Sequence, residues 1–345
     1  MAIRARSVVL GVLGLFVVLL LGAITAVGWQ VVLGPDARPV STEPFEATPE
    51  RLARGQYLVE GPAHCFHCHT EHDLSQPELP INQAKKGAGW VLPIPELNNP
   101  AAPNITPDPE TGIGTWSDDE IARAIREGVR RDGSALFPIM PYLDYASMTD
   151  EDVRSIVVYL RTIPPVPGTT PARALPFPLE HIVNTIPKPL AADRPVPART
   201  TPVERGEYLV ALAGCQGCHS PAVGGEPVPG LTLAGGEPFP DVGQPGAVIH
   251  SPNITFDPSG IAHYDEALFI ETLRSGRMGG RVLSHIMPFA FFRAMTDDDL
   301  RDVLAFLKSR PHVQHRVSNT DPPTLCPVCS RSHGLGDRNR VGQER

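Results

Sequence analysis

The chain begins with a long apolar segment. Residues 8–33 read VVLGVLGLFVVLLLGAITAVGWQVVL. As a helix this segment would be about 39 Å long, more than the ~30 Å hydrocarbon core of a bilayer, so it predicts a tilted membrane span. Arg4 and Arg6 precede it, so we expect residues 1–7 to stay in the cytoplasm and the rest to be exported. A cleaved signal peptide is the alternative, although its apolar region usually has only about 7–15 residues.

Further along the chain, apolar side chains recur at helical spacing. Two segments present the same face at i, i+3, i+4 and i+7, namely Val153, Ile156, Val157 and Leu160, and then Leu300, Val303, Leu304 and Leu307. Thr149 and Thr296 precede these faces and are suited to cap the helices. Because no long alternating strand pattern competes, we expect a mainly α fold with long Pro/Gly-rich loops between the helices.

These two faces belong to a repeat that covers most of the chain. Cys215 lies 150 residues after Cys65, and Met287 lies 147 residues after Met140. The matching blocks are RGQYLVEGPAHCFHCH (54–69) with RGEYLVALAGCQGCHS (205–220), NITPDP (104–109) with NITFDP (253–258), and IMPYLDYASMTDEDV (139–153) with IMPFAFFRAMTDDDL (286–300). The order of these blocks predicts two tandem domains, 48–165 and 201–311, a Pro-rich linker, 166–200, and a polar tail, 312–345.

Composition narrows the possible partners. The length of 345 residues suits two domains, and the 39 prolines suit irregular loops and a semi-rigid linker. The net charge is −8, and no basic stripe is visible. Because binding to phosphates requires clustered Lys and Arg, nucleic acid is not expected as a partner.

Each repeat carries one C-x-x-C-H motif, the attachment pattern of a c-type haem. The two cysteine sulfurs add to the vinyl groups on one edge of the macrocycle, and the adjacent histidine then binds the iron from the proximal face. Zinc would need four converging ligands in each repeat, and no spare cysteine serves each unit. Two covalently bound haem c groups are therefore expected, one on Cys65, Cys68 and His69 and one on Cys215, Cys218 and His219.

The repeat also suggests the sixth ligand of each iron. Met140 and Met287 both stand in I-M-P, on a loop before the last helix, where the proline removes a backbone donor and stiffens the loop. Met148 and Met295 recur as well, but they directly precede the capping threonines, where apolar packing is the expected role. We therefore expect Met140 and Met287 to be the distal ligands.

This ligand set indicates a class of function. An iron with both axial positions filled by protein has no open position for oxygen or peroxide, and methionine raises its reduction potential. We therefore expect an electron relay and not an enzyme. The alternative is a dihaem enzyme such as a peroxidase, which needs one displaceable distal ligand and nearby acid–base residues.

The motifs together resemble a known family. C-x-x-C-H, NITPDPETGIGTWSDDE, FPIMPY and MTDEDV are similar to the cytochrome c subunits of membrane-bound alcohol and gluconate dehydrogenases, over residues 48–165 and 201–310. The resemblance implies class I cytochrome c domains with proximal His69 and His219 and distal Met140 and Met287. It also implies a periplasmic relay that takes electrons from a dehydrogenase and hands them to quinone or a terminal acceptor. With the predicted N-terminal span, we expect a single-pass protein of the bacterial inner membrane with its haem domains in the periplasm. A dehydrogenase, a quinol-oxidising complex or a terminal oxidase is expected as its redox partner.

A third cysteine pair, in CPVCSRSH at 326–333, lacks a histidine directly after Cys329. No repeat blocks surround it, so it is not expected to hold a third haem. Cys326, Cys329 and His333 would form a zinc site only with a fourth ligand from elsewhere. In an oxidising compartment a disulfide between Cys326 and Cys329 is the simpler prediction.

Overall fold

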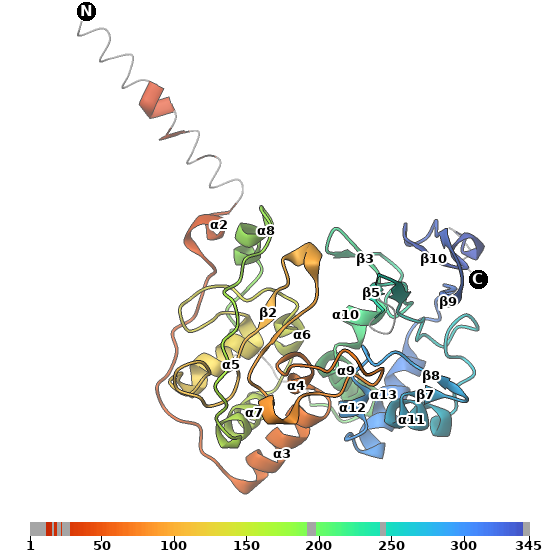
Figure 1. The fold of residues 1–345 in the computed structure, drawn as a ribbon, viewed down its shortest axis with the longest axis horizontal. Coiled ribbons are helices and arrows are strands. Elements are labelled where there is room, and N and C mark those ends of the chain that lie inside the picture. The colour runs from red at the N-terminus through yellow and green to blue at the C-terminus, as the bar shows by residue number, and fades with distance from the viewer. Residues whose placement is uncertain are drawn as a thin grey trace, which may run out of the picture.

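The computed structural model describes residues 12–15, 17–18, 22, 28–191, 198–241 and 246–340. The two repeats lie side by side, with the first in orange to yellow-green and the second in green to blue (Figure 1). Helices joined by long loops dominate both repeats. In the described part of the chain, strands pair only as two-stranded antiparallel ribbons. The mainly α architecture agrees with the helical spacing of the apolar residues.

The prediction of a membrane-spanning helix has to be corrected. Among the described residues, no helix combines the length and apolar character needed to cross a bilayer. Within the predicted span, 8–33, the element α2 covers only Gln30–Leu33, or about 6 Å, whereas a span needs about 20 residues. Residues 1–11, 16, 19–21 and 23–27 lie outside the described part. A single-pass inner-membrane location is therefore not supported.

The first repeat begins and ends with its two longest helices. Thr48 caps α3, and Ser117 with Glu120 forms a capping box that starts α5. Thr149 caps α7, as its position before the apolar face predicts. The elements are α3 (Pro49–Glu60), α4 (Cys65–Cys68), η1 (Gln83–Lys85), β1 (Trp90–Val91), η2 (Pro95–Leu97), β2 (Ala101–Ala102), α5 (Asp118–Glu127), α6 (Tyr142–Tyr145) and α7 (Asp150–Thr162).

The second repeat follows the same order of helices. Thr201 caps its first helix and Thr296 its last, so both capping positions of the first repeat recur. The elements are α9 (Pro202–Leu212), α10 (Cys215–His219), β3 (Ala222–Val223), β4 (Glu226–Pro227), β5 (Pro238–Pro240), β6 (Val248–His250), α11 (Glu266–Ser275), β7 (Arg277–Met278), β8 (Arg281–Val282), α12 (Phe289–Phe292) and α13 (Asp297–Ser309).

In each repeat the first and last helices cross at a glycine. A Cβ atom on Gly55 of α3 would lie 1.9 Å from the backbone oxygen of Ser155 in α7. A Cβ atom on Gly206 of α9 would lie equally close, 1.9 Å, to the backbone oxygen of Asp302 in α13. The glycine of the repeated R-G-x-Y-L-V block therefore lets two backbones approach more closely than any larger residue allows.

Two reciprocal hydrogen bonds join the repeats. The Tyr208 hydroxyl of the second repeat donates to Asp152 of the first at 2.6 Å, and the Tyr57 hydroxyl of the first donates to Asp299 of the second. The N–H of the capping threonine of the facing helix donates to each tyrosine oxygen, at 3.4 and 3.2 Å. The tyrosine of each repeat is therefore bound at the start of the last helix of the other.

The Pro-rich linker folds over the first repeat. It contains α8 (Leu179–Ile182) and η3 (Val183–Thr185). Leu175 and Val183 are buried there against Ala135. The described part of the linker is thus more than an extended spacer, because it forms a small apolar cluster with the first domain. Linker residues 192–197 lie outside the described part.

The tail also packs against a repeat. It forms an antiparallel ribbon of β9 (Ser318–Leu325) and β10 (Ser332–Gly334), followed by η4 (Gly336–Arg338). The Asn319 side chain exchanges two hydrogen bonds of 2.8 Å with the backbone of His250 in β6. The ribbon lies at the far end of the second repeat (Figure 1).

Candidate functional site

The first repeat encloses a cavity of about 570 Å³, a volume typical of cofactor sites. Cys65, Cys68, His69 and Met140 all line it. Linker residues 170–173 form part of its wall. The cavity therefore brings together the attachment cysteines, the proximal histidine and the distal methionine expected from the sequence.

The His69 ring is held in one orientation by the backbone. Its Nδ1 lies 2.7 Å from the carbonyl oxygen of Pro103, which accepts the ring N–H. That hydrogen bond selects the tautomer in which Nε2 carries the lone pair, as an iron-ligating histidine requires. Because α4 places Cys65 one turn before His69 and Cys68 directly before it, the residues present fit a covalently attached haem.

The second repeat reproduces this local arrangement. The His219 Nδ1 lies 2.9 Å from the carbonyl oxygen of Pro252. Cys215 and Met287 are both partly buried and pack against the apolar core of this repeat. The histidine of the C-x-x-C-H motif is thus oriented by the same kind of backbone contact in both repeats.

Burial sets the ionisation of these groups. It raises the pKa of the motif thiols, to about 12 for Cys65 and Cys215 and to about 11 for Cys68 and Cys218. Burial also lowers the pKa of both motif histidines, against the effect of their backbone hydrogen bonds. The imidazoles are therefore kept in the neutral form that binds metals.

The four recurring methionines fall into two classes. Met148 and Met295 are only 0% and 3% exposed and belong to the two apolar cores. Met140 lines the cavity and, like Met287, is only partly buried. This difference supports the choice made from the I-M-P motif, although the iron ligands themselves stay a prediction.

The first attachment motif lies at the interface between the repeats. The His64 ring stands 5.5 Å from the Phe292 ring, and the His67 ring stands 6.0 Å from the Phe291 ring, centroid to centroid. Both phenylalanines belong to α12 of the second repeat. This contact could not be predicted from the repeat, because the second motif has no histidines at the matching positions.

The two attachment motifs also lie near each other. Burial is the main reason for the raised pKa of Cys68, and the nearby Cys218 thiol of the other repeat contributes to it. Asp144 of the first repeat has the same effect on the pKa of Cys215 and Cys218. The second pair of cysteines therefore faces the first repeat.

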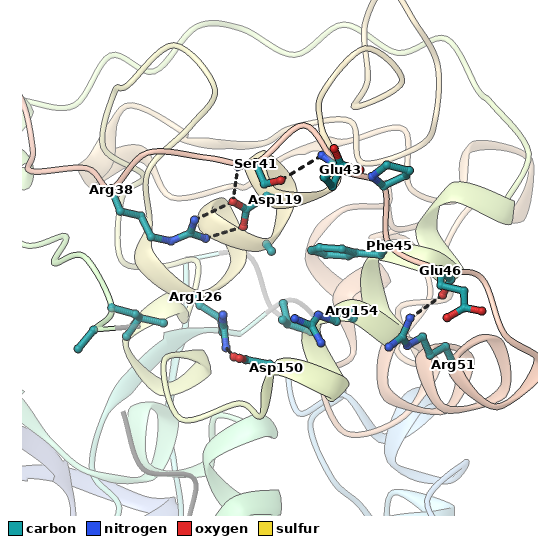
Figure 2. Close-up of a pocket in the computed structure, with 15 residues that line it drawn as sticks. Arg38, Ser41, Glu43, Phe45, Glu46, Arg51, Asp119, Arg126, Asp150 and Arg154 are labelled. Atoms are coloured by element: carbon teal, nitrogen blue, oxygen red, sulfur yellow. Dashed lines mark hydrogen bonds and ion pairs between the residues drawn. The ribbon is translucent and has the colours of Figure 1, made fainter. Parts of the chain in front are cut away.

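A separate cavity of about 550 Å³ lies between residues 38–51 and the first domain. Figure 2 shows its wall of paired charges, with the Arg38 guanidinium donating to both Asp119 oxygens at 2.7 Å. Arg126 pairs with Asp150 at 2.5 Å across the same space. Among the described residues, the lining of this cavity has no cysteine, histidine or methionine. The ion pairs of Arg38 with Asp119 and Glu127 attach the N-terminal segment to the domain.

The third cysteine pair is fully buried. Both thiols are free, and each sulfur lies against a histidine: Cys326 Sγ is 3.5 Å from His315 Nε2, and Cys329 Sγ is 3.4 Å from His333 Nε2. Burial raises the pKa of Cys329 to about 11. The disulfide expected from the sequence is not formed here and stays a prediction.

Comparison with known proteins identifies the relatives of this chain. The cytochrome c family model matches residues 203–311. The chain is 31% identical to the fructose dehydrogenase cytochrome subunit of Gluconobacter japonicus over 295 residues, 81% of this chain and 57% of that protein. It is 29% identical to the alcohol dehydrogenase (quinone) cytochrome c subunit of Gluconobacter oxydans (strain 621H) over 309 residues, 83% of this chain and 61% of that subunit.

A third relative has nearly the same extent. The diheme cytochrome c-type protein of Cereibacter sphaeroides is 29% identical over 291 residues, 80% of this chain and 92% of that protein. The chain spans only about three fifths of the two dehydrogenase subunits. All three names describe cytochromes, which supports the prediction of an electron-transfer component rather than an enzyme.

Proposed function

We propose that this chain is a c-type cytochrome that relays single electrons through two covalently attached haems, each bound by one histidine and one methionine. The first cavity carries this proposal, because two thiols, an oriented imidazole and a thioether converge on it. The repeated motifs of the second domain extend the proposal to a second haem.

The cysteines, the histidine and the methionine of each repeat would hold the haem in different ways. In each repeat the two motif cysteines would hold the porphyrin edge through thioether bonds. His69 and His219 would offer Nε2, with Nδ1 fixed on a backbone carbonyl, and Met140 and Met287 would offer the opposing sulfur. A haem so ligated exchanges one electron at a time and has no position left for a substrate.

The interface between the repeats supports internal transfer. The first attachment motif contacts α12, which directly follows the second I-M-P loop. The reciprocal tyrosine bonds hold the domains in one relative orientation. A fixed orientation keeps the separation of the two centres constant, so one electron can pass from one to the other without domain movement.

We place a dehydrogenase on the donor side of the relay. The names of two relatives describe cytochrome subunits of fructose and alcohol dehydrogenases. A flavin- or quinone-dependent dehydrogenase releases electrons that a chain of single-electron centres can accept in turn.

Replacing each proposed methionine ligand tests the ligation. Met140→Leu and Met287→Leu keep the side-chain volume, so each should cost less than about 1.5 kcal/mol of stability. We expect each variant to lose about half of the red absorption band of the oxidised protein that reports iron–methionine ligation, and to have one centre of lower midpoint potential.

Met148→Leu is the matched control, because the same change is made in the apolar core away from the cavity. It should leave the absorption band and both potentials unchanged. A full band in Met140→Leu, or its loss in Met148→Leu, would contradict the ligand assignment. Peroxide turnover by the wild-type protein would favour the dihaem enzyme instead.

A further inference from the structure

Four metal-binding side chains meet at the junction of the tail and the second repeat. Cys326 and Cys329 lie in the connection between β9 and β10, His333 lies in β10, and His315 precedes β9. One ligand atom from each of the four lies within 4.8 Å of the others. The sequence places three of them in one octapeptide, whereas the fold alone adds His315.

The spacing of these atoms matches a tetrahedral site. The two sulfur–nitrogen pairs are separated by 3.5 and 3.4 Å. Zinc bonds of about 2.3 Å to sulfur and about 2.0 Å to nitrogen, at tetrahedral angles, require a sulfur–nitrogen separation of about 3.6 Å. These two pairs therefore already have the separation that one central zinc ion would impose, and all four ligand atoms lie within 4.8 Å of one another.

The surroundings orient the ligands. His315 Nδ1 lies 2.9 Å from the carbonyl oxygen of Ala234, and His333 Nδ1 lies 3.1 Å from that of Gly334. Both rings therefore direct the Nε2 lone pair at the sulfurs. The Asn339 amide donates to Cys326 Sγ at 3.4 Å, a contact that stabilises a thiolate.

Complete burial argues for an ion. The exposed fraction of the four residues is 0–1%. A disulfide would leave two buried imidazole nitrogens without a donor, and such unsatisfied polar atoms are costly. One divalent cation satisfies both nitrogens and both sulfurs. We propose that His315, Cys326, Cys329 and His333 bind one Zn²⁺ in a closed, structural site.

A comparison with the first repeat shows that the histidine ligand His315 is specific to the second repeat. Asn253 donates to the carbonyl oxygen of His315 at 3.2 Å, and Asn104 donates to that of Gly168 at 3.5 Å, so Gly168 is the counterpart of His315. A Cβ atom on Gly168 would lie 2.3 Å from the Ala88 oxygen. The first repeat therefore has no room for a histidine where the second places its ligand.

The ion would brace the proximal side of the second haem site. His315 contacts the Ala234 carbonyl, and the next N–H, that of Gly235, donates to the His219 carbonyl oxygen at 2.7 Å. Zinc would thus clamp the tail onto the loop that supports the proximal histidine. Its role is structural, because all four coordination positions come from the protein.

Metal analysis of the full-length, purified protein tests the site. We expect one zinc per chain, whatever the haem content, with two sulfur and two nitrogen ligands at about 2.3 and 2.0 Å by X-ray absorption. Cys329→Ser and His315→Gln should retain at least ten-fold less zinc after dialysis against a weak chelator. His312→Gln, at an exposed histidine of the same segment, should retain it fully.

The wild-type measurements decide the question even if the variants do not fold. A zinc-free chain that is two hydrogens lighter, with Cys326 linked to Cys329 in its peptide map, would overturn the proposal in favour of the disulfide. A chain with both thiols free that takes up no zinc from zinc chloride would overturn it equally. Iron or copper in place of zinc would contradict the choice of metal.

Discussion

Single glycines determine how closely the helices of each repeat pack. We expect Gly206→Ala to destabilise the second domain by about 3 kcal/mol, because the new methyl group would overlap the Asp302 carbonyl and the Phe306 side chain. The free energy of unfolding from urea titration measures this cost.

Gly280→Ala is the matched control for that substitution. Gly280 is exposed, and a Cβ atom there would meet nothing within 4 Å. This variant should unfold within about 0.5 kcal/mol of the wild type. Equal stability of the two variants would show that the helices can separate at the crossing without cost.

At the residue scale, the predicted haem residues of the first repeat line one cavity, and their role as haem ligands stays a prediction. The C-x-x-C-H spacing placed each thiol pair beside its imidazole, and the I-M-P motif distinguished Met140 from Met148, which precedes a capping threonine. His315 was missed because it stands eleven residues before Cys326 in a loop without periodicity. Only the fold shows that it takes the place of Gly168.

At the scale of elements, one arginine attaches the N-terminal segment to α5. Arg38 pairs with Asp119 and with Glu127, each at 2.7 Å, and the Glu127 side chain is 0% exposed. Arg38→Ala leaves that buried carboxylate without its counter-ion, so we expect a loss of about 3 kcal/mol. Lys85→Ala breaks the exposed pair with Glu71 and should cost less than about 1 kcal/mol.

The ion pair of Arg38 with Asp119 also predicts how the stability of the protein falls at low pH. Burial alone would raise the pKa of Asp119, but hydrogen bonds from Arg38 and the Ser41 N–H outweigh it and lower this pKa below 3.8. A lowered folded-state pKa gives stability above pH 3.8 that is lost as the pH falls through the folded value. The wild type should therefore lose more stability than Arg38→Ala between about pH 5 and pH 2. Parallel curves for the two proteins would contradict this explanation.

Element prediction succeeded where local signals were strong. The caps at Thr149 and Thr296 and the faces that follow them give α7 and α13 directly. The prediction of a membrane helix from the length and apolar character of residues 8–33 was wrong, because in the described part of that region the structure gives only α2 as a named helix. The ribbon of β9 and β10 was missed because it contains two prolines and few apolar residues.

For the whole molecule, the reciprocal tyrosines should determine whether the repeats unfold together. Tyr57→Phe and Tyr208→Phe each remove a hydrogen bond to a carboxylate, at about 2 kcal/mol each. We expect the single calorimetric transition of the wild type to split into two in the double variant.

Tyr142→Phe provides the comparison. Its hydroxyl is buried and has no hydrogen-bond partner among the described residues, so its removal should be neutral or slightly stabilising. Should the double variant keep one transition at the wild-type temperature, the tyrosines would not be what couples the domains.

The relative placement of the domains could not be read from the sequence. The repeat predicts two similar folds, but both copies of the tyrosine are consistent with packing inside their own domain. Each tyrosine instead contacts the other repeat, and this depends on how the surfaces of α3, α7, α9 and α13 fit together. No local sequence pattern encodes that fit.

The core of the first repeat has a consequence for biosynthesis. Tyr208, Leu212 and Phe291, all from the second repeat, pack within it, and linker residues 170–173 close its cavity. A ribosome delivers these residues only after Met140 has emerged. The cavity of the first repeat therefore gains its complete wall only after the linker and the second repeat have been synthesised.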